Sequence, residues 1–117
     1  MSAVERVVCV PVTADGQVDP HWGRASRLAL VRVNPDGELG KIDTVEVGWD
    51  RQHEEGGEGL HHARIARFLR EHGVHAVVAR HMGPPMKAML ERMRIAVCLG
   101  AEGEVRQAIR RSCASLL

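Results

Sequence analysis

The sequence predicts a single α/β domain with a mixed five-stranded sheet, in the strand order 3-2-1-4-5, flanked by helices. Three observations predict this class. The first half holds three strand-like segments separated by turn signals, which indicate an antiparallel meander. The second half alternates helical and strand-like segments, which indicates parallel pairing through right-handed crossovers. The length of 117 residues suits one domain with one core, so residues 1–117 are treated as a single unit.

The three expected strands of the first half differ in how their apolar residues are arranged. Residues 4–12 form a nearly continuous apolar run, which is typical of a central strand covered on both faces. Residues 27–34 form the second strand, which ends at the turn sequence Asn34-Pro35-Asp36-Gly37. Residues 41–49 alternate apolar and polar side chains, as an outer strand with one solvated face does.

A helix is expected after the polar, glycine-rich residues 50–59, which we interpret as a loop. An apolar stripe predicts this helix over residues 60–72, with Arg64, Arg67 and Arg70 facing solvent and Gly73 ending it. A buried strand, a helix opened by two prolines, a last strand and a final helix complete the chain, at 74–79, from 84, at 95–99 and from 102.

The methionines and cysteines are interpreted as packing residues. Met86, Met89 and Met93 have the spacing of one helix face, and a methionine stripe is more often core than ligand. Cys9 and Cys98 lie in apolar strand-like runs, where cysteine usually acts as a small hydrophobic residue. Because the chain has only three widely spaced cysteines, we expect free thiols in a reducing compartment.

The composition argues against several classes of function. Apolar residues make up 44% and charged residues 26% of the chain, as in ordinary globular proteins. The net charge of +1 gives no electrostatic basis for binding nucleic acid or an anionic membrane. No stretch has the character of a membrane span or a signal peptide, so we expect a cytoplasmic protein.

Histidine is the residue type that points to a binding site. Neutral imidazole is the commonest protein ligand for borderline metals, and four of the seven histidines fall in three segments that the fold is expected to bring together. These candidate metal ligands are His21, His61, His62 and His81. The role of His53 is left undecided, and His72 and His75 are expected to flank a helix–strand turn without a ligand role.

The predicted topology gives these segments a common edge of the sheet. In open α/β sheets, ligands bind beyond the carboxyl ends of the parallel strands, where the strand order reverses. Residues 13–15, 80–83 and 99–102 follow those strand ends, and His61 and His62 are expected in the first turn of a helix at the same edge. A helix N-terminus also offers free backbone N–H groups to an anion. We therefore predict a ligand-binding crevice there.

The chain resembles a known family at several motifs. Val10-Pro11-Val12-x-x-Asp15-Gly16, followed by His21-Trp22-Gly23-Arg24-Ala25, resembles the opening of the dinitrogenase iron–molybdenum cofactor biosynthesis family, the NifX-like domain. That opening typically ends in His-Phe-Gly-Arg-Ala, so Trp22 replaces the usual phenylalanine. Gly83-Pro84 and Leu99-Gly100-Ala101-Glu102-Gly103 also match the family. The resemblance implies a fold similar to that of ribonuclease H.

The resemblance also implies a function without catalysis. Characterised members bind or carry metal–sulfur cluster precursors, and a related group holds a molybdenum–copper sulfide cluster. A labile iron, molybdenum or copper sulfide cluster is therefore the implied ligand, and a cluster donor or acceptor protein is the implied partner. His21 and Arg24 match the motif, and Gly83 belongs to the matching Gly-Pro. A sulfide-rich cluster is anionic, so Arg24 and Arg80 are expected to hold its periphery while imidazoles bind the metal.

Two other functions remain open at this point. The same crevice would suit a small-molecule or protein-binding module that uses no metal. A ribonuclease H-like nuclease is less favoured, because it needs several clustered carboxylates to bind Mg²⁺. Only Asp15 and Glu102 lie near the predicted edge, and no Gly-x-Ser-x-Gly sequence suggests a hydrolase. We therefore expect a protein that is not an enzyme.

Overall fold

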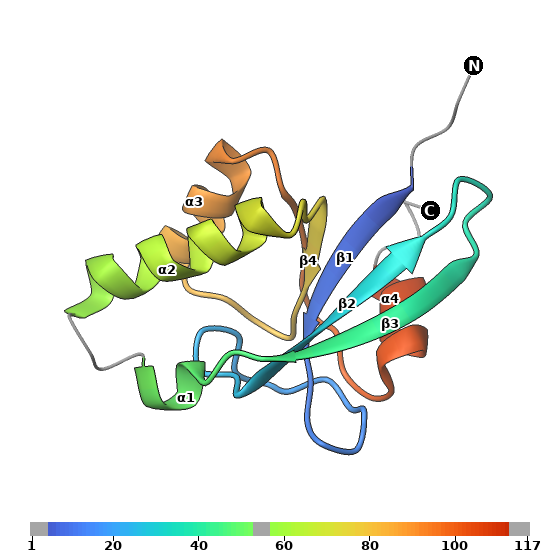
Figure 1. Cartoon of the computed structure of the whole chain (residues 1–117), viewed down its shortest axis with the longest axis horizontal. Coiled ribbons are helices and arrows are strands. Elements are labelled where there is room, and N and C mark those ends of the chain that lie inside the picture. Colours follow the sequence, from blue (N-terminus) through green and yellow to red (C-terminus); the bar gives the residue numbers. More distant parts are fainter. Residues whose placement is uncertain (1–4, 53–56, 113–117) are drawn as a thin grey trace.

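The computed structural model describes residues 5–52 and 57–112, which form one sheet with helices on both faces (Figure 1). The strands are Arg6–Pro11 (β1), Arg27–Val33 (β2), Leu39–Glu46 (β3), Ala76–Val78 (β4) and Ala96–Cys98 (β5). Their order is β3-β2-β1-β4-β5. β1 pairs antiparallel with β2 and parallel with β4, so the sheet is mixed. The predicted fold class and strand order are confirmed.

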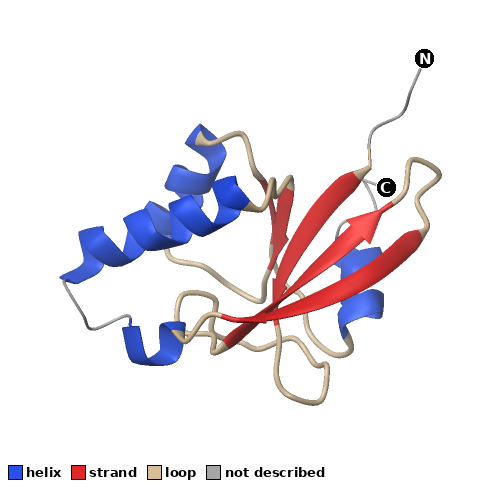
Figure 2. Cartoon of the chain, in the orientation of Figure 1, coloured by secondary structure: helices blue, strands red, loops and turns tan. Residues whose placement is uncertain are grey.

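The helices divide between the two faces of the sheet. They are Trp49–Gln52 (α1), Gly57–Glu71 (α2), Pro84–Arg92 (α3) and Val105–Ser112 (α4). Figures 1 and 2 show α2 and α3 on one side of the sheet and α4 on the other. Two separate buried clusters match this division, because one includes side chains of α4 and the other includes side chains of α2 and α3.

The position of β1 in the centre of the sheet accounts for its continuous run of apolar residues. Val8 and Val10 of β1 belong to the cluster on the α4 face, whereas Cys9 belongs to the cluster on the α2 and α3 face. Side chains alternate along a strand, so a strand covered on both faces needs apolar residues at successive positions. The three side chains are at most 3% exposed, as the sequence predicts for a central strand.

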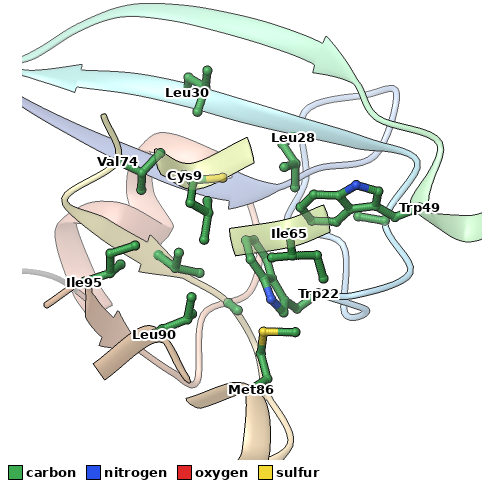
Figure 3. Close-up of a cluster of buried hydrophobic side chains, with 14 residues drawn as sticks. Cys9, Trp22, Leu28, Leu30, Trp49, Ile65, Val74, Met86, Leu90 and Ile95 are labelled. Atoms are coloured by element: carbon green, nitrogen blue, oxygen red, sulfur yellow. The ribbon is translucent and has the colours of Figure 1, made fainter. Parts of the chain in front are cut away.

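The cluster on the α2 and α3 face contains both tryptophans (Figure 3). The rings of Trp22 and Trp49 meet edge to face, with centroids 5.5 Å apart. Met86 is 6% exposed within this cluster, which confirms its predicted packing role. Met89 and Met93 are half-buried and pack against the same cluster, so they are less enclosed than the sequence predicts.

The segment between β3 and α2 differs from the predicted strand and loop. β3 ends at Glu46 rather than at Trp49, because Gly48 takes a positive φ of 65° and turns the chain. The backbone N–H of Trp49 then donates to the carbonyl of Ala25, and its indole enters the core at the start of α1. α2 begins at Gly57, earlier than the sequence predicts. His53 and the third cysteine, Cys113, lie outside the described residues.

Two helix arginines are docked on backbone carbonyls, and one of them, Arg64, is predicted from the sequence to face solvent. Arg64 donates from its guanidinium to the carbonyl of Gln52, at 3.1 Å. Arg106 donates to the carbonyls of Leu39 and Gly40, at 3.3 and 3.0 Å. Long arginine stems pack along the surface while the head group donates to carbonyl oxygens, which helical periodicity alone does not reveal. In residues 5–52 and 57–112, no helix has both the length and the apolar character needed to cross a membrane.

Candidate functional site

A cavity of about 570 Å³ lies where the chain leaves β1 and β4, at the carboxyl ends of these parallel strands. Three segments line it: the loop after β1, one face of α2, and the loop from β4 into α3. The lining residues are His21, Trp22, Gly23, Arg24, His61, His62, His81, Met82, Gly83, Pro85 and Met86. Every residue that the sequence nominates for the site is among them, with the exception of Arg80.

Arg80 and two of the expected edge segments lie elsewhere. Arg80 is exposed, and its carbonyl accepts a hydrogen bond from the N–H of Gly100, at 2.8 Å. The loop after β1 sends Thr13 and Gly16 toward the other face, where they line a separate cavity beside α4. Ala101 is buried in the cluster on that α4 face. The strand ends share an edge as predicted, but the sheet divides their loops between its two faces.

The loop that carries the His-Trp-Gly-Arg motif is held by hydrogen bonds at Asp19 and by the buried side chain of Trp22. The N–H of Asp19 donates to the carbonyl of Pro11, and the Asp19 carboxylate accepts from the N–H of His21, at 2.9 Å. This is the local turn that aspartate favours. Trp22 anchors the loop by burying its indole, whereas His21 and Arg24 on either side stay exposed. The alternation leaves an imidazole and a guanidinium at the cavity.

His61 is a buried bridge between α2 and the motif loop. It is 6% exposed, with Nε2 lying 2.7 Å from the carbonyl oxygen of Gly23 and Nδ1 lying 2.8 Å from a guanidinium nitrogen of Arg64. A guanidinium can only donate, so Nδ1 must accept and the proton must sit on Nε2, which donates to Gly23. The imidazole also meets the ring of Trp49 edge to face, at 6.0 Å between centroids.

These contacts give His61 a role that the sequence analysis did not predict. Both ring nitrogens are engaged, so binding a metal would require His61 to give up a hydrogen bond to Arg64 or to Gly23. One signal was present in the sequence, because His61 and Arg64 are spaced i, i+3 and such residues are neighbours on a helix surface. No such spacing in the sequence predicts the hydrogen bond from His61 to the carbonyl of Gly23.

The other candidate ligands form an open arrangement. His62 is half-buried, and His21 and His81 are exposed at the cavity. Within residues 5–52 and 57–112, no group of three or more His, Cys, Asp or Glu side chains is placed to hold a metal ion. The described residues therefore do not form a closed metal-binding shell.

The helix termini offer less to an anion than the sequence suggests. α2 begins at Gly57, so His61 and His62 lie inside the helix rather than in its first turn. α3 does begin beside the cavity, but Pro84 and Pro85 occupy its first positions and have no N–H to donate. Positive charge at the cavity therefore comes from Arg24, and none of the described lining residues is acidic.

Comparison with known proteins identifies the family. Residues 5–115 match the family model described as dinitrogenase iron-molybdenum cofactor. The chain belongs to this family. No curated protein matches the sequence. The match covers most of the chain and confirms the resemblance that the His-Trp-Gly-Arg motif carries.

Solved structures show the same fold for this family member. The protein designated PH0822 has a TM-score of 0.71 at 20% identity, over 92% of this chain and 89% of that chain. The apo orange protein from Desulfovibrio gigas has a TM-score of 0.70 at 24% identity, over 97% and 92%. TM1290 from Thermotoga, described provisionally as a NifB protein, has a TM-score of 0.65 at 20% identity, over 93% and 88%. At these identities the likeness shows the fold; similarity to ribonuclease H stays an expectation.

Proposed function

We propose that this family member binds a metal–sulfur cluster or cluster precursor as cargo in the cavity, without catalysing a reaction on it. The observation that carries the proposal is the meeting of His21, His62 and His81 with Arg24 around one cavity of about 570 Å³. These residues come from three segments far apart in the sequence. Their convergence would supply metal ligands and a counter-charge in the same place.

The chemistry of the lining suits an anionic cluster with soft or borderline metals. Imidazole binds iron and copper, and the thioethers of Met82 and Met86 favour soft metals. The Arg24 guanidinium would pair with the negative periphery of a sulfide-rich cluster, and no acidic side chain among the described lining residues opposes it. Few protein ligands also favour release, which a carrier needs. A cluster donor or acceptor protein in the cytoplasm is the partner that this role requires.

The same geometry argues against a nuclease. The carboxylates that Mg²⁺ needs are absent from the described cavity lining, and Asp15 is engaged by the hydroxyl of Thr13 in the loop on the other face. A binding module for a small molecule or protein, with no metal, remains the competing function. It would use the same cavity but would not depend on the imidazoles as ligands.

Anaerobic reconstitution tests the proposal. The wild-type protein should be incubated with tetrathiomolybdate, and separately with iron or copper plus sulfide, then desalted and analysed for metal and visible absorption. We expect a retained chromophore that His21→Ala and His81→Ala reduce strongly. His72→Ala is the matched control, because His72 is exposed in the turn directly after α2 and does not line the cavity.

Two results would overturn the proposal. One is the absence of retained metal with every combination on the wild-type protein. The other is equal retention by the wild type, His21→Ala and His81→Ala. Either result would favour the module that binds without a metal.

A further inference from the structure

Trp22 carries a polar atom that the protein itself leaves without a partner. Its side chain is 4% exposed, and its indole Nε1 is buried with no hydrogen-bond acceptor in reach among the described residues. Among the side-chain nitrogen and oxygen atoms of the described residues, Nε1 of Trp22 is the buried atom that has no hydrogen-bond partner. Buried donors in native proteins are nearly always paired, so an orphan N–H calls for an acceptor that the folded chain does not supply.

The residue that carries this unpaired donor lines the cavity. Trp22 and Met86 both line the cavity, and Figure 3 shows the indole nitrogen on the edge of the ring that faces Met86 in that view. The ring cannot turn freely, because it packs in the buried cluster and meets Trp49 edge to face at an interplanar angle of 81°. Packing therefore fixes the direction of the N–H, on the edge of the ring that lies on the Met86 side in Figure 3.

We propose that the Nε1–H of Trp22 is a specificity-determining donor, which forms a hydrogen bond to an acceptor atom on the edge of the bound cargo. This inference rests on the proposed function. The acceptor would be a terminal or bridging sulfide, or an oxo atom in the same place. A phenylalanine, the usual residue of the motif that this chain resembles, has no N–H and would not favour such a ligand.

The physical argument is the asymmetry between a paired and an unpaired donor. In the ligand-free protein the N–H has already lost its hydrogen bonds to water, so a ligand acceptor restores a bond without a further desolvation cost on the protein side. Hydrogen bonds to a charged acceptor are stronger than neutral ones, and a sulfide-rich cluster is anionic. An apolar ligand in the same position would leave the donor unpaired.

Access to the donor requires a small movement of the cavity wall. The Nε1 atom is itself covered in the ligand-free structure. Met82 and Met86 line the cavity together with Trp22; Met86 belongs to the same core cluster and Met82 packs against it. Methionine side chains are unbranched and change rotamer easily. A ligand that displaces one of these thioethers would reach the N–H without moving the backbone.

The affinity test compares variants that separate the N–H from the ring. Wild type, Trp22→Phe and Trp49→Phe should be titrated with tetrathiomolybdate by anaerobic equilibrium dialysis, with molybdenum measured on both sides. We expect Trp22→Phe to bind about tenfold more weakly, which corresponds to about 1.4 kcal/mol. Trp49→Phe is the matched control, since Trp49 is buried in the same cluster but does not line the cavity.

A change of packing must be distinguished from loss of the donor. In the Trp49→Phe background, Trp22 should be replaced by β-(3-benzothienyl)alanine, in which sulfur stands in place of the N–H and the ring shape is kept. We expect the same loss of about tenfold in affinity. The ligand-free unfolding midpoint should not fall, because the removed donor had no partner. A structural role for the N–H would instead lower that midpoint.

The indole N–H signal reports on the bond directly. In a ¹⁵N-labelled protein, the Trp22 Nε1–H resonance should move downfield on saturation with tetrathiomolybdate, while the Trp49 resonance should move much less. Wild-type binding with no loss in either Trp22 replacement, or with an unmoved Trp22 resonance, would overturn this inference and leave the proposed function standing. No binding to the wild type would overturn both.

Discussion

Replacing His61 by phenylalanine should destabilise the fold and loosen the motif loop. Phenylalanine keeps a planar ring beside Trp49 but loses the bond that His61 donates to Gly23 and the bond that it accepts from Arg64. Because His61 is 6% exposed, water cannot fully replace these partners. The carbonyl of Gly23 is then left without the donor that joins the loop to α2.

The size of the effect follows from the two bonds. A net hydrogen bond between neutral groups contributes about 1 kcal/mol, and one that involves a charged donor contributes about 1.5–3 kcal/mol. Arg64 is half-buried and keeps its bond to the carbonyl of Gln52 in the variant. The bond between Arg64 and His61 should therefore contribute near the lower end of the range for a charged donor. We therefore expect His61→Phe to lower the free energy of unfolding by about 2–3 kcal/mol.

Urea unfolding of a double-mutant cycle tests this reasoning. His61→Phe, Arg64→Met and the double variant should give a coupling of about 1–2 kcal/mol, because the two side chains share one bond. His72→Phe is the control, since it also exchanges a histidine ring for phenylalanine but at an exposed position in the turn after α2, and it should change stability by less than about 1 kcal/mol. A His61→Phe midpoint equal to that of wild type, or a coupling near zero, would refute the bridge.

Three further predictions concern the rest of the fold. Met86→Ala should cost about 2–5 kcal/mol in urea unfolding, because Met86 is 6% exposed; a loss well below 1 kcal/mol would contradict its place in the core. The pKa of Glu104 lies below its ordinary range because two backbone N–H groups at the start of α4 donate to its carboxylate. Its stabilising effect is therefore present at neutral pH and lost as the pH falls through that lowered pKa. The stability difference between wild type and Glu104→Gln should then shrink in acid. A stability difference that does not change with pH would contradict this prediction. Burial raises the pKa of the Cys9 thiol, so a thiol reagent at neutral pH should modify Cys9 only on unfolding; rapid native modification, read by mass spectrometry, would oppose this.

The sheet was predictable because its signals are local. The run around Val8, Cys9 and Val10 identifies a strand covered on both faces, and that strand is central in the structure. The strand–helix repeats then require parallel neighbours on one side. The cavity follows from the same topology, since the switch-point rule needs only the strand ends. His21 and His81 therefore meet at one cavity although 60 residues, about half the chain, separate their positions.

The roles of individual side chains were less predictable, because they depend on loop conformation. The bond from His61 to Gly23 joins groups 38 residues apart, and no periodicity in the sequence signals it. Arg80 directly follows the strand-like run but is exposed and does not line the cavity, which the sequence does not reveal. Trp22 reads as a conservative apolar replacement until the structure shows that its N–H is buried and unpaired.

The central claim is that this family member holds its cargo in the cavity between the motif loop, α2 and α3. Anomalous diffraction at the molybdenum edge, from crystals grown anaerobically with tetrathiomolybdate, tests it most directly. The account predicts a molybdenum peak inside the cavity bounded by His21, His62 and His81, with a sulfur atom near the indole nitrogen of Trp22. A peak on another surface of the protein, or a cavity without molybdenum at saturating tetrathiomolybdate, would contradict it.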